Sequence, residues 1–203
     1  MTNKKGIDGK LLSDMSLEEL WELFPIVLKA YNSAYTVWYA EEKANLEQVI
    51  GKQYIKRINH IGSSSVKGLI GKPTVDILLE IEDDYNIEQL KEVLHHAGWL
   101  LMSSEIESDL KLSFNKGYTF AGFADKVFHL HIRHFGNWSE LYFRDYLVDH
   151  KDIAAEYGKF KMSLIKEFKH NRDGYTNAKT DFITKYSEIA KQLYKNKYSN
   201  EIE

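Results

Sequence analysis

The stretch from residue 54 to residue 81 constrains the fold most, because two strand-like runs flank a loop rich in glycine, serine and lysine. Residues 54–61 and 74–81 are dominated by apolar and β-branched side chains, which predicts two strands. The loop between them reads Gly-Ser-Ser-Ser-Val-Lys-Gly-Leu-Ile-Gly-Lys-Pro. The second strand carries Asp76 close to its start. A Gly-Ser loop is therefore expected beside an acidic side chain.

Periodicity outside this stretch predicts further elements of both kinds. The capping-box spacing of Ser16 and Glu19 indicates a short helix that Pro25 interrupts. Aromatic and aliphatic side chains recur at helical spacing after residue 150. The other expected elements are helices at 35–50 and 87–96 and strands at 26–30, 99–105, 110–114 and 127–133.

These elements predict an α/β (α+β) fold in which a mixed central sheet is followed by a C-terminal helical cap. The 203 residues are enough for one domain with a substantial core. We expect a single domain over residues 1–203, with the sheet core at about 26–135 and the cap at about 136–195.

Composition excludes several classes of function. The absence of cysteine excludes a disulfide framework, thiol catalysis and Cys-ligated zinc. The net charge of −3 gives no general argument for nucleic-acid binding, and no apolar run approaches the length of a membrane span. No apolar segment follows the first six residues, so a secretory signal is not expected. A cytoplasmic protein that does not bind membranes is expected, and the oligomeric state is not indicated.

The loop chemistry suits a phosphate group. Gly62 allows close approach of the backbone, Ser63 and Ser65 supply hydroxyl groups, and Lys72 supplies positive charge. Asp76 on the following strand could hold Mg²⁺ against phosphate oxygens, because that ion prefers hard oxygen ligands. The loop is not a Walker A loop, since proline follows Lys72 where Ser or Thr would bind magnesium. The alternative is a serine-rich turn that caps itself.

The same stretch resembles the signature of the GrpB-like family, whose members have a nucleotidyltransferase-like fold and no characterised activity. Ser64 and Lys67 depart from the family pattern, where Thr and Pro are usual. The similarity extends from about residue 26 to residue 194. The matching residues are His60, Ile61, Gly62, Ser63, Ser65, Val66, Gly68, Leu69, Lys72, Pro73, Asp76 and Ile77, followed by His129-Leu130-His131-Ile132, Phe143-Arg144-Asp145-Tyr146-Leu147, Tyr175, Lys179 and Phe182.

The resemblance implies nucleotide binding and, for an enzyme, metal-dependent nucleotidyl transfer. Such transferases normally carry two carboxylates two residues apart on one strand, plus a third on a neighbouring strand, to hold two metals. Here Leu78 stands two residues after Asp76, and Glu80 shares the face one step further along. The missing carboxylate is an argument against ordinary two-metal transfer.

Four further residues carry candidate functional side chains. His129 and His131 lie two residues apart on a predicted strand, so both side chains point to the same face. With Asp76 they could bind a divalent metal, and the alternative is a pair of packed, hydrogen-bonded histidines. Arg144 could bind a phosphate or form an internal ion pair with Asp145. Lys179 lies on an apolar helical stripe, so it reaches the rim, a carboxylate or a bound phosphate.

Three functions follow from these residues. The first is a nucleotidyltransferase-like enzyme that binds a nucleoside triphosphate through Gly62, Ser63 and Ser65, with Mg²⁺ at Asp76. The second is a non-catalytic protein that binds a nucleotide or phosphorylated metabolite and has lost the two-metal centre, which Leu78 favours. The third is a metal-dependent hydrolase that uses His129 and His131. The nucleotide and the acceptor are not indicated.

Overall fold

Five strands form one mixed sheet in the order β1-β2-β5-β4-β3. The computed structural model describes residues 12–107, 109–195 and 197–199. Strand β2 runs parallel to β5, and the other neighbouring pairs are antiparallel. The strands are β1 (Ile55–Ile61), β2 (Val75–Ile81), β3 (Leu100–Glu105), β4 (Lys111–Thr119) and β5 (Gly122–His134).

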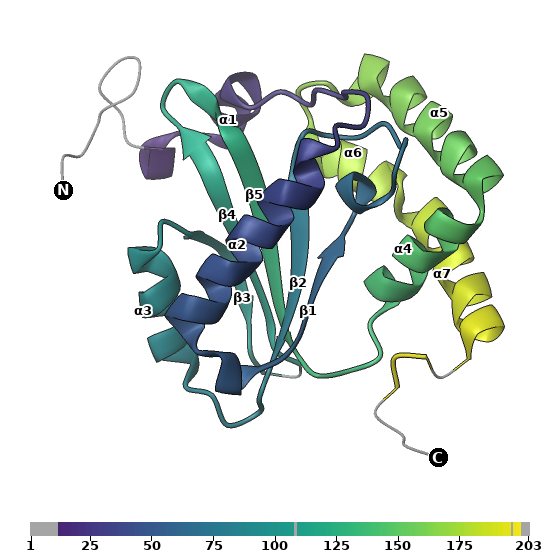
Figure 1. Ribbon diagram of the computed structural model, residues 1–203. Helices are drawn as coiled ribbons and strands as arrows, with labels where there is room; N and C mark the ends of the chain where they lie inside the picture. The colour runs from purple at the N-terminus through teal and green to yellow at the C-terminus, as the bar shows by residue number, and fades with distance from the viewer. Residues whose placement is uncertain (1–11, 108, 196, 200–203) are drawn as a thin grey trace.

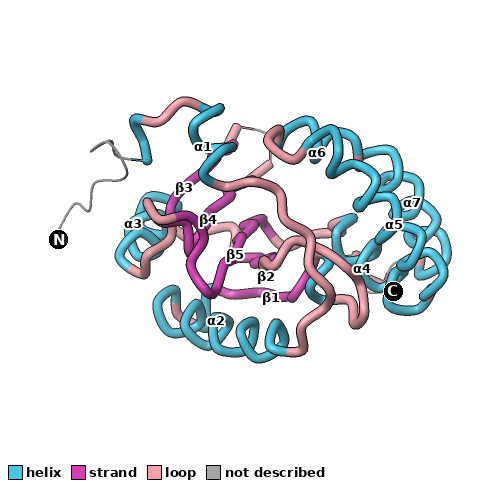
Figure 2. Tube along the Cα trace, turned by 90° about the horizontal axis from the view of Figure 1, so that it is seen from above, coloured by secondary structure: helices cyan, strands magenta, loops and turns pink. Residues whose placement is uncertain are grey.

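Seven α-helices surround this sheet in the described part of the chain (Figure 1). Ser16 and Glu19 form the expected capping box at the start of the first helix. Figure 2 shows the last four helices gathered on the side of the sheet away from α2. The helices are α1 (Leu17–Leu23), α2 (Ala34–Ile50), α3 (Ile87–His96), α4 (Ser139–Asp149), α5 (Lys151–Phe168), α6 (Arg172–Ala178) and α7 (Thr180–Tyr194).

The main hydrophobic core lies between one face of the sheet and helices α2 and α3. Alternate residues of β2, such as Ile77 and Leu79, point into it because successive side chains of a strand face opposite sides. On the other face Leu78 packs against Leu141 of α4. This second face therefore lies under the C-terminal helices, and the predicted fold class is confirmed.

The strand expected at residues 26–30 does not form. Ile26 instead bonds to the Lys169 carbonyl, and Lys29 makes a single antiparallel bridge to Gly71. Its partner is a loop residue and not a sheet strand, so no ladder extends in either direction. The segment ties the loop before β2 to the C-terminal helices.

Strands β4 and β5 extend well beyond the expected bounds and form a hairpin. The sequence around Gly117 and Gly122 interrupts the alternation of apolar and polar residues, which hid the extension. Gly117 has φ +91°, and a Cβ there would lie 2.3 Å from the Lys126 carbonyl oxygen. The register of the two strands shifts at this point, as in a β-bulge. The bulge precedes Tyr118, whose hydroxyl group reaches His129.

The apolar stripe expected to run through Lys179 is divided between two helices. Lys179 ends α6 and precedes α7, so it occupies the joint between them. No helix in the described ranges combines the length and the apolar character needed to cross a membrane.

Candidate functional site

The parallel pairing of β2 with β5 brings the acidic residue and both histidines to one face of the sheet. Asp76 pairs with His129, and Leu78 pairs with His131. Both histidines line the same cavity as Asp76. Their expected location on a strand beside Asp76 is therefore observed, although a metal-binding role stays a prediction.

Gly62 allows the loop to approach the Asp76 carboxylate closely. Its φ is +69°, a conformation that favours glycine, and a Cβ there would lie 2.3 Å from Asp76 Oδ2. Ser63 follows and also lines the cavity. The glycine is thus required both by its backbone conformation and by the position of the acid.

His129 is held on both sides of its ring. Its Nδ1 lies 2.9 Å from Asp76 Oδ1, and its Nε2 lies 2.8 Å from the Tyr118 hydroxyl and 3.0 Å from an Arg172 nitrogen. A guanidinium can only donate, so Nε2 accepts and the proton is assigned to Nδ1, which donates to Asp76. Both nitrogens of His129 are therefore engaged.

The charges around this pair favour an ionised Asp76 and a neutral His129. Burial alone would raise the pKa of Asp76, but the His129 hydrogen bond and the Lys72 charge hold it well below its usual range. Burial, reinforced by Lys72 and Arg172, lowers the pKa of His129 to about 4 despite the opposing effect of Asp76. Asp76 therefore stays negative at neutral pH.

Three lysines lie near this single carboxylate. Lys161 of α5 is 2% exposed, and its Nζ donates to Ser63 Oγ at 2.7 Å and to the Ile70 carbonyl. Burial and the neighbouring Arg172 lower the pKa of Lys72 to about 7. Burial and Lys179 lower the pKa of Lys161 to about 7. The pKa of Lys179 falls to about 8 through burial, although Asp76 opposes that shift.

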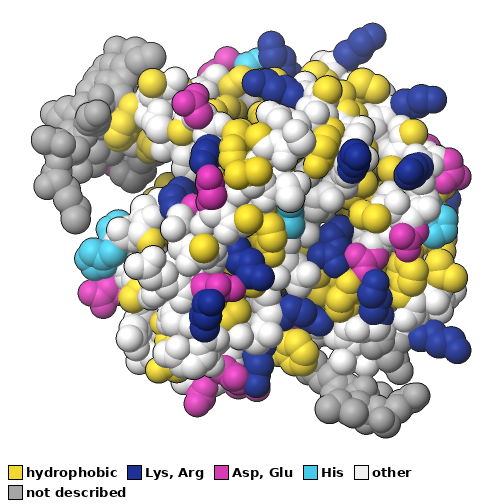
Figure 3. Space-filling model, in the orientation of Figure 1, with side chains coloured by type: hydrophobic (Ala, Val, Ile, Leu, Met, Phe, Trp, Pro, Cys, Tyr) yellow, Lys and Arg dark blue, Asp and Glu magenta, His cyan; other side chains and the backbone are white. Residues whose placement is uncertain are grey.

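These groups line a cavity of about 860 Å³ between the sheet and the C-terminal helices. Eight of its lining side chains are Lys or Arg, whereas two, Asp76 and Glu140, are acidic. On the face drawn in Figure 3, Lys and Arg side chains lie among Asp and Glu, and the whole chain has a net charge of −3. The positive charge is therefore concentrated in the cavity.

Of the predicted phosphate-binding residues, Ser65 is the one that does not line this cavity. Its hydroxyl donates to the Gly62 carbonyl at 2.6 Å, within the 3-10 turn Ser63–Ser65. Ser64 is buried and lies 2.9 Å from His60 Nε2 on the other side of the loop. Ser65 thus caps the turn, Ser64 bonds to β1, and Ser63 is the serine of the three that lines the cavity.

Arg144 lines the cavity, but four of its five N–H donors are used within the protein. It donates to Asp145 at 2.8 Å, to Asn59 at 3.0 Å and to the His60 carbonyl at 3.1 Å. A further bond joins it to the Tyr198 hydroxyl. This arrangement matches the internal ion pair considered from sequence, and it ties α4 to β1. Phosphate binding by Arg144 stays a prediction.

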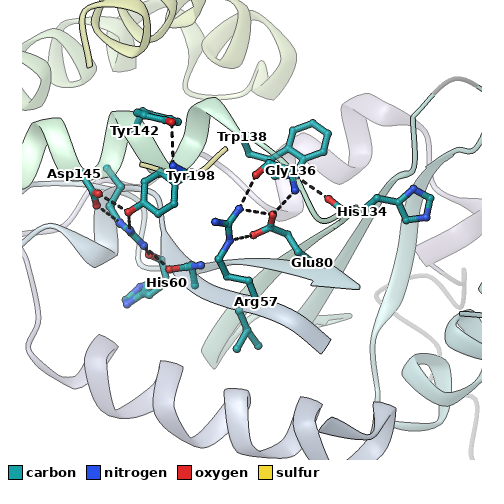
Figure 4. A network of polar contacts seen from close by, with 12 residues as sticks. Arg57, His60, Glu80, His134, Gly136, Trp138, Tyr142, Asp145 and Tyr198 are labelled. Atoms are coloured by element: carbon teal, nitrogen blue, oxygen red, sulfur yellow. Dashed lines mark hydrogen bonds and ion pairs between the residues drawn. The ribbon is translucent and has the colours of Figure 1, made fainter. Parts of the chain in front are cut away.

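Glu80, the second acid on the strand, belongs to a separate network (Figure 4). Its carboxylate is fully buried and accepts two hydrogen bonds from Arg57 and one from the Gly136 backbone. The Arg57 guanidinium also lies 4.7 Å from the centre of the Phe135 ring. The charge of the buried Glu80 is therefore balanced by the half-buried Arg57 and not by a group at Asp76.

The donor set does not fit a two-metal centre. Leu78 occupies the position of the second carboxylate, and Glu80 is paired with Arg57. Within the described ranges, no group of three or more His, Cys, Asp or Glu side chains is arranged to hold a metal ion. A single Mg²⁺ at Asp76, or another divalent ion at His129 and His131, stays a prediction.

Sequence reasoning missed Lys161, Arg172 and Tyr118. Lys161 lies four residues after Tyr157, on the same apolar helical stripe, and this was a usable signal because a lysine there needs a buried partner. Arg172 follows the end of α5 and carries no comparable pattern. Tyr118 reaches the site only through the hairpin. The predicted Lys179 does line the cavity, with its Nζ 4.4 Å from the centre of the Tyr175 ring.

Comparison with known proteins shows what the chain is similar to. A family model described as GrpB protein matches residues 25–188. The glutamate-rich protein GrpB of Alkalihalophilus pseudofirmus is 31% identical over 162 residues, which cover 78% of this chain and 91% of that protein. UPF0157 protein YqkA of Bacillus subtilis is 29% identical over 197 residues, 94% of this chain but 54% of that protein.

A solved structure agrees with these relatives. The crystal structure of conserved protein GrpB from Enterococcus faecalis aligns with a TM-score of 0.71 and 28% sequence identity. The alignment covers 83% of this chain and 99% of that chain. Sequence and three-dimensional comparisons therefore point to the same group of proteins.

Proposed function

The chain belongs to the GrpB family, and from this premise we propose that it binds a nucleotide or another phosphorylated small molecule in the cavity around Asp76. The observation that carries the proposal is the convergence of Lys72, Lys161, Arg172 and Lys179 on one carboxylate. Buried ammonium groups are costly unless an anion compensates them. A phosphorylated ligand supplies that compensation.

The free donors of this cluster support the proposal. In the described part of the chain, neither Lys72 nor Lys179 forms a hydrogen bond or an ion pair through its ammonium group, although each side chain is largely covered. Asp76 and Arg172 act on the pKa of both lysines, and Lys161 and Lys179 also act on that of Lys72. Phosphate oxygens accept charge-assisted hydrogen bonds from such donors.

We propose binding ahead of metal-dependent transfer or hydrolysis. The position of Leu78 and the pairing of Glu80 with Arg57 argue against two-metal transfer. The engagement of both His129 nitrogens argues against hydrolysis by a two-histidine metal site. Neither observation bears on the binding of an anion.

Calorimetric titration with ADP, AMP and orthophosphate tests the proposal. The double variant Lys72→Gln/Lys179→Gln should weaken the binding of ADP at least about tenfold, which corresponds to about 1.4 kcal/mol. Lys159→Gln is the matched control, because this exposed lysine of α5 lines a different groove. Affinity that is unchanged in the double variant, or no binding of any of the three compounds to the unmodified protein, would contradict the proposal.

A further inference from the structure

We infer that the cavity is built for a diphosphate group held by Lys72, Lys161, Arg172 and Lys179 in place of a divalent metal. The inference rests on the proposed function, which it refines by naming the anion and the counter-charge. It is carried by the groups around Asp76: the resemblance implies metal ligands there, but lysines and an arginine are present instead.

One of the two Asp76 carboxylate oxygens already has a hydrogen-bond partner, and the other lies close to the loop. The first accepts the His129 hydrogen bond at 2.9 Å, and the second lies against the Gly62 backbone. A metal bridge to phosphate would need at least one of these oxygens together with further carboxylates. Leu78 and the Arg57-bound Glu80 do not provide them.

Cations take up the positions around the acid instead. Lys72, Lys161 and Lys179 are each influenced by the Asp76 charge, which raises their pKa against the effect of burial. Asp76 therefore helps to keep the ammonium groups charged before the ligand arrives. Its role in this site is to position and charge the lysines, with no contact to phosphate required.

The charge balance selects the number of phosphate groups. With all three lysines protonated, which is the state that a bound anion favours, four cations and one carboxylate give a formal charge of +3. A terminal phosphate carries about −1.5 to −2 at pH 7, and each bridging phosphodiester-type group adds about −1. A diphosphate therefore matches the cluster more closely than a single phosphate does.

The donors needed for such a ligand are present. Lys161 uses two of its three hydrogens on Ser63 and Ile70, which leaves one. Arg172 contacts Tyr118 and His129 through one terminal nitrogen, so its remaining N–H groups are available to a ligand. These donors come from the loop before β2 and from both sides of the α5–α6 connection, so they can surround a bridged pair of phosphates.

The effect of magnesium on affinity tests the inference. Mg²⁺ bound to a diphosphate cancels two of its negative charges, so it should weaken attraction to a lysine cluster. We would titrate the full-length protein with pyrophosphate and with ADP, in EDTA and then in excess MgCl₂. Binding should persist in EDTA and weaken about threefold or more in MgCl₂. Orthophosphate should bind at least about tenfold more weakly than pyrophosphate.

Controls separate this inference from the proposed function. The two buffers are brought to the same ionic strength with NaCl, so that the general screening effect of added salt is the same in both. Lys72→Gln/Lys179→Gln should lose affinity for pyrophosphate, whereas Lys159→Gln should not. Binding that requires MgCl₂ and disappears in EDTA would overturn the inference and leave the proposed function intact. Failure of pyrophosphate, ADP and orthophosphate to bind in either buffer would overturn both.

Discussion

The ammonium nitrogen of Lys161 lies 2.7 Å from the hydroxyl oxygen of Ser63, although 98 residues separate them in the chain. The contact joins α5 to the loop that precedes β2, and a second bond from the same nitrogen reaches the Ile70 carbonyl. Through this lysine the position of the helical cap determines the shape of the loop.

Gly62→Ala should destabilise the protein by about 3 kcal/mol and weaken phosphate binding. The new Cβ would lie 2.3 Å from Asp76 Oδ2, so the carboxylate must move. Gly68→Ala is a matched control: its φ of +84° carries a similar backbone strain of about 1–2 kcal/mol, but nothing lies within 4 Å of its Cβ position. Urea unfolding of both variants gives the comparison, and equal losses would contradict the close approach.

His129→Gln should cost about 2–3 kcal/mol, whereas His131→Gln should cost less than about 1 kcal/mol. His129 bonds to Asp76, Tyr118 and Arg172. For His131, no side-chain hydrogen bond is found in the described part of the chain, although it faces the same cavity. Chemical denaturation measures both costs. A larger loss of stability in His131→Gln than in His129→Gln would contradict the structural role assigned to His129.

Arg57→Met should destabilise the protein by about 3 kcal/mol, because it leaves the fully buried Glu80 carboxylate without its main partner. Adding Glu80→Met should recover much of this loss, since the stranded charge is then removed. The recovery should be incomplete, because the Gly136 N–H also loses its acceptor. A double-mutant cycle by urea unfolding measures the coupling, and simple additivity of the two changes would contradict a paired buried charge.

The free energy of unfolding of the ligand-free protein should rise between pH 7 and pH 9. Unfolded lysine keeps its proton up to about pH 10.4, whereas Lys72 and Lys161 have a folded-state pKa of about 7 and Lys179 of about 8. Between these values the unfolded state binds more protons, so stability increases with pH. Each lysine with a folded-state pKa of about 7 contributes about 2 kcal/mol over this range, so independent titration of all three gives a rise on the order of 6 kcal/mol.

The double variant Lys72→Gln/Lys179→Gln isolates this effect. Because only Lys161 then contributes, the rise in stability from pH 7 to pH 9 should be smaller than in the unmodified protein. Urea midpoints across this pH range measure the difference. Parallel pH profiles for the two proteins would mean that these lysines do not titrate as buried groups.

Most secondary structure could be predicted from sequence because each signal is local. The helices expected at 35–50 and 87–96 agree with α2 and α3 to within one residue, and β2 ends where its apolar run ends. The predictions that differ from the structure concern elements whose form depends on contacts between separate segments. Residues 26–30 pair with a loop through one bridge, and the β4–β5 hairpin depends on a bulge at Gly117.

The sequence by itself determined the fold class, the Gly-Ser loop before the acid-bearing strand, and the motifs that identify the family. It also placed Asp76, His129 and Lys179 among the candidates for the site. These inferences need only residue type and spacing, which are properties of short segments.

Only the tertiary structure decided which side chains are free to act. Glu80 has the right chemistry, but Arg57 of the neighbouring strand uses its carboxylate, and Ser65 donates its hydroxyl to the Gly62 carbonyl within its own turn. Lys161 and Arg172 join Asp76 because the helical cap packs over that face of the sheet. A hydrogen bond or an ion pair forms between surfaces brought together by burial of apolar area, so neither partner's own sequence neighbourhood records it.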